Sequence, residues 1–139
     1  MSKQLFFFGS LLALATLTGC SNKSIEGTWN VKSDSLHAFS DYTMTFVDGV
    51  MTSKATSEGV KVLIEERYRM SGSKLETPGA KVTVDASALE GEKRKLFESL
   101  SFEFKWDLEQ AKKFTVKFKD SDHVTLTGEK QVIELERAK

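Results

Sequence analysis

The stretch VKVLIEERYRM, residues 60–70, is the longest run of alternating polarity in the chain and decides the fold class. Its even-numbered positions are apolar except for Glu66, and its odd-numbered positions are mostly charged. Alternation with a period of two is typical of a β-strand that has one face toward a core and the other toward water. We therefore expect residues 60–70 to form a half-buried strand.

The same alternation recurs along the chain on both sides of this stretch. Further strands are expected at residues 25–31, 42–47, 50–56, 74–77, 81–85, 102–108, 114–119, 124–127 and 133–137. Asp48-Gly49 has the composition of a two-residue hairpin turn. Ser87 can cap a short helix that continues to Leu100, although Gly91 interrupts it. No alternation of strands with helices appears, so an antiparallel sheet is expected.

These elements predict an all-β domain: an antiparallel up-and-down barrel of about eight strands with one short helix. A two-sheet sandwich is the alternative. Closure is favoured because nearly every strand is apolar on one side only, and because a barrel leaves no exposed sheet edges. About eight strands enclose an interior just wide enough for packed side chains or for one small ligand. The outward faces are charged, which excludes a barrel that spans a membrane.

The N-terminal segment resembles the signal of a bacterial lipoprotein. Lys3 precedes an apolar run, and Leu17-Thr18-Gly19-Cys20 follows the lipobox pattern of Leu, a small residue, Gly or Ala, and Cys. The resemblance implies cleavage before Cys20, which would then carry a diacylglyceryl group on sulfur and an acyl chain on its new amine. The apolar run, residues 5–19, is shorter than the roughly 20 residues that a membrane-spanning helix needs.

The expected organisation is a signal peptide at 1–19, a tether at 20–24 and a barrel domain at 25–139. Two lipid-type anchors hold a protein on a membrane effectively permanently. Because Ser21 rather than Asp follows the cysteine, the resemblance implies the outer membrane, with the domain facing the periplasm. Cys20 is the only cysteine, so no intramolecular disulfide can form and the domain must be held by its core.

Gly27-Thr28-Trp29 begins the first predicted strand and resembles the Gly-x-Trp opening of lipocalin-like barrels. In that family the glycine permits a close turn, the tryptophan plugs the closed end, and an arginine near the end of the barrel packs over its ring. Arg137 shares the inward parity of the last strand and is the candidate for this arginine. The domain is shorter than a usual lipocalin and is more similar to the small lipocalin-like lipoproteins of bacteria.

Glu66 is the one polar residue on its strand face, and two interpretations stay open. Either a twist or a bulge near Glu65 lets Glu66 reach solvent, or Glu66 is a polar group in a mostly apolar pocket that orients a ligand or pairs with an inward arginine. The predicted inner wall is rich in aromatic residues and consists of Tyr68, Met70, Phe102, Phe104, Trp106, Phe114 and Phe118. These side chains either fill the core or line a cavity for an acyl chain or another small apolar molecule. The candidate ligand-binding residues are Glu66, Tyr68, Phe104 and Trp106.

Composition and motifs argue against several functional classes. Twenty basic residues balance twenty acidic ones, so no basic excess indicates a nucleic-acid partner. His37 and His123 are the only histidines, and neither belongs to a metal-ligand spacing. Nucleophile elbows, P-loops and dinucleotide-binding glycine patterns are missing from the sequence. We expect no enzyme, no metal site and no cofactor apart from the covalent lipid on Cys20.

Two functions stay open on this basis. The first is a membrane-anchored, lipocalin-like barrel that binds a small hydrophobic ligand in the cell envelope. The second is a non-catalytic accessory protein with a solid core, whose loops at residues 33–41 and 86–100 contact an envelope protein.

Overall fold

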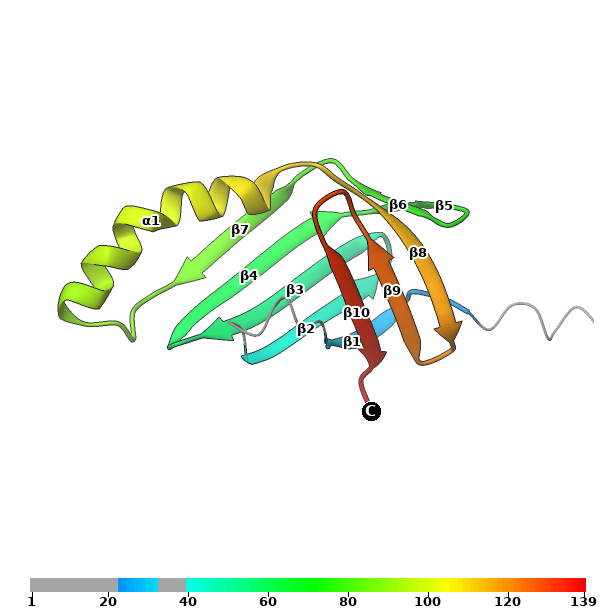
Figure 1. Cartoon of the computed structure of the whole chain (residues 1–139), viewed down its shortest axis with the longest axis horizontal. Helices are drawn as coiled ribbons and strands as arrows, with labels where there is room; N and C mark the ends of the chain where they lie inside the picture. The colour runs from blue at the N-terminus through cyan, green and yellow to red at the C-terminus, as the bar shows by residue number, and fades with distance from the viewer. Residues whose placement is uncertain (1–22, 33–39) are drawn as a thin grey trace, which may run out of the picture.

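The computed structural model describes residues 23–32 and 40–139, without the side chains of residues 100–104. Over these residues the chain forms one antiparallel sheet and one helix, α1 (Gly91–Glu109), as Figure 1 shows. The strands are β1 (Gly27–Val31), β2 (Ser40–Val47), β3 (Val50–Ser57), β4 (Val60–Arg67), β5 (Arg69–Ser71), β6 (Lys74–Thr77), β7 (Ala80–Asp85), β8 (Lys112–Asp120), β9 (His123–Thr127) and β10 (Val132–Arg137). The predicted all-β, antiparallel class is confirmed.

The sheet is curled, and chain connections join the two ends of its strand order. That order is β5-β6-β8-β9-β10-β1-β2-β3-β4-β7. Only Tyr68 separates β4 from β5, and only Pro78-Gly79 separates β6 from β7. These four strands are therefore the two arms of one long hairpin, in which β5 pairs with β6 and β4 pairs with β7. If each arm is counted once, eight arms follow one another in up-and-down order.

The barrel is closed along only part of its length. β6 pairs with β8 from Lys74 opposite Thr115 to Thr77 opposite Lys112. Beyond that point β7 leaves β8, and β4 is the only strand to which β7 is paired in the described part of the chain. The helix α1 connects these two diverging strands and lies along β7 (Figure 1).

The prediction for residues 87–108 is wrong in its detail. The short helix ending at Leu100 and the strand at 102–108 are replaced by the single helix α1. Residues 91–109 contain no β-branched side chain, whereas the observed strands are rich in Val, Ile and Thr. Ion pairs one helical turn apart support α1, with Arg94–Glu98 at 3.2 Å and Lys105–Glu109 at 3.8 Å.

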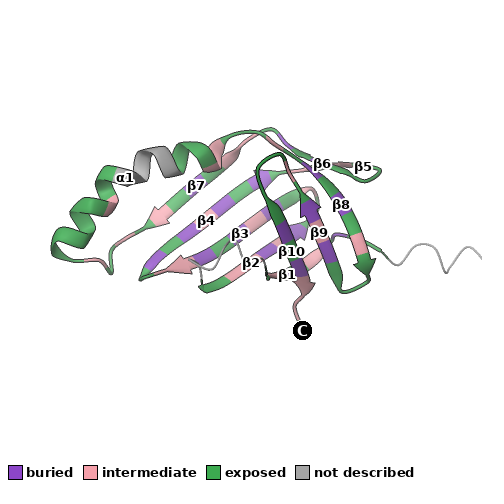
Figure 2. Cartoon of the chain, viewed as in Figure 1, coloured by how far each residue is buried: buried purple, intermediate pink, exposed green. Residues whose placement is uncertain are grey.

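Two apolar clusters stabilise the fold, and Figure 2 shows buried residues in purple along the strands. The first, the barrel core, fills the closed part of the sheet and consists of Ile25, Trp29, Met44, Phe46, Met51, Leu75, Phe114, Val116, Val124, Leu126, Ile133 and Leu135. The second, the helix-covered core, consists of Val60, Val62, Ile64 and Val82, with Phe97 and Leu108 of α1 packed against it. Since sheet and helix each bury one face, α1 completes the domain where the barrel is open.

The stretch at residues 60–70 keeps its predicted inward face, although Tyr68 divides it into β4 and β5. Along β4 the buried positions are Val60, Val62, Ile64 and Glu66, and the positions between them are partly or fully exposed. Asp48 and Gly49 form the predicted hairpin turn between β2 and β3, with φ values of 50° and 76°. Two consecutive positive φ angles match the twist of the flanking strands, which fixes the register of this hairpin.

Candidate functional site

The first and last strands meet at a stacked pair of side chains. Trp29 and Arg137 are partners in the ladder between β1 and β10, and Arg137 Cζ lies 4.2 Å from the centroid of the Trp29 ring. Trp29 is fully buried, and its Nε1–H donates to the carbonyl oxygen of Ile25 at 2.7 Å. A guanidinium over an indole contributes about 0.5–2 kcal/mol. The pair joins the two ends of the domain and leaves the indole no surface for a ligand.

Arg137 also holds the segment that leads into β1. Its Nη1 donates to the carbonyl of Glu26 at 3.0 Å, and its Nη2 donates to the carbonyl of Ser24 at 3.1 Å. Gly27 has a φ of +117°, and a Cβ at this position would lie 2.8 Å from Arg137 Nη1. Glycine suits both the backbone angle and the close approach. The chain before β1 is therefore tied to the last strand.

Glu66 is buried, with only 5% of its surface exposed. The ladders on both sides of β4 run through Glu66 without a register shift, so the interpretation that a twist or bulge carries Glu66 to solvent is wrong. Lys112 Nζ lies 3.4 Å from Glu66 Oε1, although an arginine was the expected partner. Glu66 Oε2 is buried and has no hydrogen-bond partner among the described residues.

Lys112 connects the end of α1 to the sheet. Its Nζ donates to the carbonyl of Leu108 at 2.8 Å, and its backbone N–H donates to Thr77 Oγ1 at 3.3 Å. The side chain of Lys112 is 20% exposed, compared with 3% for Glu66. A cation at the C-terminal end of a helix interacts favourably with the helix dipole. Lys112 therefore reaches from solvent to the buried carboxylate while capping α1.

Two further polar side chains lie near this pair on the inner side of the sheet, Tyr42 of β2 and Ser53 of β3. Burial raises the pKa of the Tyr42 hydroxyl, a hydrogen bond with Ser53 lowers it, and the charge of Glu66 raises it. Ser53 is only 3% exposed. We use the name inner polar cluster for Tyr42, Ser53, Glu66, Thr77 and Lys112. The cluster lies where the barrel core gives way to the helix-covered core.

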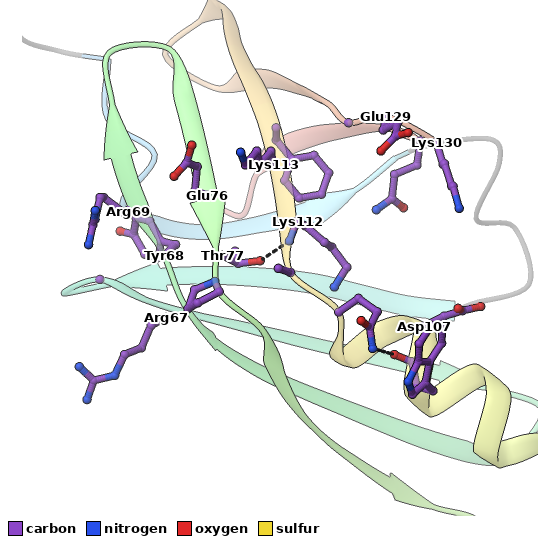
Figure 3. A pocket seen from close by; sticks show the side chains of 18 of the residues that line it. Arg67, Tyr68, Arg69, Glu76, Thr77, Asp107, Lys112, Lys113, Glu129 and Lys130 are labelled. Atoms are coloured by element: carbon purple, nitrogen blue, oxygen red, sulfur yellow. Dashed lines mark hydrogen bonds between the residues drawn. The ribbon is translucent and has the colours of Figure 1, made fainter.

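A groove of about 1190 Å³ opens beside the inner polar cluster. Its walls come from the junction of β4 and β5, from β6, from the C-terminal end of α1 and from the start of β8. The turns between β2 and β3 and between β9 and β10 complete them. In Figure 3, Lys112 lies near the centre of this space, with Thr77 on one side and Asp107 on the other. Tyr68, Trp106 and Phe114 supply aromatic surface, and the remaining lining carries charges of both signs.

Tyr68 lies at the break between β4 and β5 and lines the groove. Its ring packs edge-on against Phe46, with centroids 5.3 Å apart, and its hydroxyl donates to Glu26 Oε1 at 2.8 Å. Burial, followed by the hydrogen bond to the Glu26 carboxylate, raises the pKa of Tyr68 to about 12. The phenol therefore stays neutral at physiological pH and links the barrel core to the start of β1.

The strand expected to carry the aromatic inner wall at residues 102–106 is wrong, because these residues belong to α1. Trp106 is 55% exposed and lines the groove from the helix. Phe104 lies in the same helix, but its side chain is outside the described residues, as is the whole of Cys20. Of the four candidate ligand-binding residues, the groove therefore brings together Tyr68 and Trp106, and Glu66 adjoins it through Lys112.

The described residues contain no cluster of three or more His, Cys, Asp or Glu side chains that could hold a metal ion. His123 Nδ1 lies 2.8 Å from Asp120 Oδ1, and this contact lowers the pKa of the Asp120 carboxyl. His37 is outside the described residues. In the same part of the chain, no helix has the length and apolar character needed to cross a bilayer.

Lys112, Tyr42 and Ser53 were not predicted as site residues. A signal for Lys112 is present, because it shares the parity of Phe114, Val116 and Phe118 on the inner face of β8. Its pairing with Glu66, 46 positions away in the chain, depends on how β4 and β8 lie in the curled sheet. A search of family models and of curated proteins found none that this chain matches.

Proposed function

We propose that this chain is a lipid-anchored envelope protein whose lipocalin-like barrel binds a small amphipathic molecule in the groove. The observation that carries the proposal is the buried Glu66 carboxylate beside Lys112, whose Oε2 has no hydrogen-bond partner in the described part of the chain. The ligand has an apolar body and a head group that donates a hydrogen bond, such as a hydroxyl or an amine.

The free energy of burying charge supports this ligand chemistry. An ionised carboxylate is costly in a protein interior unless it is paired and fully hydrogen-bonded. The contact from Lys112 Nζ to Glu66 Oε1, at 3.4 Å, is longer than the roughly 2.7–2.9 Å of a strong charge-assisted hydrogen bond. A donor on a ligand that enters beside Lys112 would complete the hydrogen bonding of the carboxylate.

The aromatic part of the groove lining can contact the apolar body of such a molecule. Ligand sites are mostly apolar and place a few polar groups at fixed positions. Tyr68, Trp106 and Phe114 provide aromatic surface around Lys112. The barrel core below is filled by large side chains, so the ligand occupies the groove and not the closed end of the barrel.

The binding test uses residues 20–139 with Cys20→Ser and a fluorescent long-chain alcohol as the probe. We expect Glu66→Gln to weaken binding about tenfold, the equivalent of one hydrogen bond to a charged group. Glu65→Gln is the matched control, because Glu65 is the neighbouring residue on the exposed face of β4. Denaturation curves of both variants separate binding from stability. Equal binding by the two variants, or no binding by the parent, rejects the proposal.

The anchor needs a test of its own. We expect mass spectrometry of the protein extracted from membranes to find Cys20 at the N-terminus with diacylglyceryl and acyl groups. Cys20→Ser should release the protein from the outer-membrane fraction, since without lipid only weak surface contacts hold it. Retention of Cys20→Ser in that fraction would rule out the lipid as the anchor.

The alternative function, an accessory protein that acts through its loops, is favoured by the packing of the barrel core. Trp29, Phe46, Leu75 and Leu126 are completely buried there. Crosslinking in intact cells distinguishes the two functions. A protein partner captured reproducibly, together with no binding of the alcohol probe, would support the accessory role.

A further inference from the structure

An exposed pair of valines marks the tip of the hairpin between β2 and β3. Val47 and Val50 are direct partners across the two-residue turn at Asp48-Gly49. They are 50% and 42% exposed, and both are among the few large apolar side chains that the described residues leave exposed. Together they form a small apolar surface at the tip of the hairpin.

The valine tip lies beside the point where the chain enters the domain. Phe46 is the ladder partner of Gly27, which places Val47 next to Glu26. Tyr68 bridges the same two places, because its N–H donates to the carbonyl of Gly49 at 2.9 Å and its hydroxyl donates to Glu26 at 2.8 Å. In Figure 1 the start of β1 and the turn between β2 and β3 lie toward the right, and α1 lies toward the left.

The position of Cys20 limits how far this end can lie from lipid. Arg137 binds the carbonyls of Ser24 and Glu26, so the domain is fixed from Ser24 onward. Cys20 precedes Ser24 by four residues. An extended chain advances at most about 3.6 Å per residue, so this tether spans about 14 Å at most. A lipid on Cys20 therefore brings the end of the domain that contains Ser24 to the bilayer surface.

Charged residues near the hairpin tip are compatible with a shallow contact between the tip and the bilayer surface. Arg67 is the ladder partner of Val50, Arg69 is two residues further on, and both are exposed. Arginine can lay its stem on apolar surface while its guanidinium meets lipid phosphates. Asp48 lies in the turn itself, which argues against deep insertion.

We propose that the hairpin tip Val47–Val50, with Arg67 beside it, docks on the bilayer surface and gives the anchored domain a fixed orientation. The inference rests on the proposed lipid attachment to Cys20. Asp48, Gly49, Arg67 and Arg69 also line the groove. Docking therefore holds one wall of the groove against the membrane, from which an amphipathic ligand can enter.

The experiment uses the full acylated protein in vesicles of phosphatidylethanolamine and phosphatidylglycerol. Cys20 is the only cysteine and is blocked by lipid, so a cysteine introduced at Val47 or Val50 is the single free thiol for a fluorescent label. Lys61→Cys is the matched control, because Lys61 is exposed at the opposite end of β4. Brominated acyl chains quench fluorophores that touch the bilayer.

We expect labels at Val47 and Val50 to be quenched at least about threefold more strongly than the label at Lys61, since only the tip reaches the interface. Equal quenching at the three positions overturns the docking proposal. Mass spectrometry of the same samples keeps the two proposals apart. Acylated protein with equal quenching removes the docked orientation alone, whereas a Cys20 without lipid removes both the anchor and the docking.

Discussion

The two cores of this domain contain different side chains because the sheet is finished differently around each. In the barrel core, the sheet curls onto itself, and large side chains such as Trp29, Phe46 and Phe114 meet across the interior. In the helix-covered core, β4 and β7 present short β-branched side chains to α1. A sheet that closes on itself buries its apolar face in its own interior. An open sheet needs a second layer, here a helix, to cover its apolar face.

The inner polar cluster lies at the boundary between the barrel core and the helix-covered core. The ladder between β6 and β8 ends where Thr77 faces Lys112, and Lys112 turns its side chain toward Glu66 and the end of α1. Buried polar groups are costly in either core, but at the boundary Lys112 still reaches water. The change from closed barrel to helix-covered sheet is therefore what creates the candidate site.

The largest expected effect is in the barrel core. Trp29→Ala should lower the free energy of unfolding by about 3–5 kcal/mol, because it leaves a large cavity and removes the stacking partner of Arg137. Urea denaturation followed by circular dichroism measures the change. Trp106→Ala is the matched control, because Trp106 is 55% exposed, and it should cost less than about 0.5 kcal/mol. Similar losses in the two variants would contradict the assignment of Trp29 to the core.

The next largest effect on stability is expected for the ion pair of Glu66 and Lys112, at the boundary between the two cores. Lys112→Met should lower stability by about 3 kcal/mol, because it leaves the buried carboxylate of Glu66 without its cation. The double variant Glu66→Leu with Lys112→Met should recover much of that loss, since apolar side chains can replace a buried ion pair. A double-mutant cycle in urea measures the coupling. If the two single losses simply add, Glu66 and Lys112 do not interact.

A smaller effect is expected in the helix-covered core. Ile64→Ala should cost about 2 kcal/mol, at the low end for this substitution, because Ile64 keeps 8% of its surface exposed and α1 can settle toward it. Amide hydrogen exchange should rise in α1 and stay unchanged in β9 and β10, if the two cores open separately. Leu126→Ala in the barrel core should instead raise exchange throughout the sheet. Identical exchange patterns would mean that the domain has one cooperative core.

The smallest effect concerns the link between the barrel core and the start of β1. The folded-state pKa of Tyr68 is about 12 against an ordinary value of 10, so its neutral phenol stabilises the fold. This contribution is complete below pH 10 and is lost as the pH rises from 10 toward 12. The chain has only two tyrosines, so absorbance of tyrosinate can follow Tyr68 in the Tyr42→Phe variant.

Glu26→Gln should lower the pKa of Tyr68, because it removes the carboxylate that accepts the phenol hydrogen bond. The pKa should stay above its ordinary value, since burial is the larger cause of the shift. A Tyr68 that titrates at its ordinary value in the parent would contradict both the burial of its ring and the contact with Glu26.

Alternation predicts a strand well only where residue type agrees with it. Along residues 60–64 the alternating positions are filled by Val and Ile, and the predicted inner face is the buried one. Along residues 102–108 the same alternation of apolar and charged positions occurs in a helix. The missing signal was composition, because residues 91–109 carry Glu, Lys, Leu and Phe but no Val, Ile or Thr.

The candidate site was only half predictable for a related reason. Glu66 is conspicuous in the sequence because it interrupts an apolar strand face, and this can be recognised from its neighbours in the chain alone. Its environment is not local, since Lys112, Tyr42 and Ser53 come from three other strands. Trp106 was predicted as a ligand-binding residue on the inner face of a strand, whereas it lines the groove from the helix α1.

Outside residues 87–108, the sequence by itself determined the strands, their inward faces, the tight turns and the antiparallel class, because each depends on residues that are neighbours in the chain. It also contains the glycine at position 27 and the arginine at position 137 that the two ends require. Only the tertiary structure decided where the barrel stops closing, that α1 covers the open part, and that Glu66 meets Lys112. Those outcomes depend on how a curled sheet brings together strands that are far apart in the chain. The polarity pattern of a short stretch carries no information about such contacts.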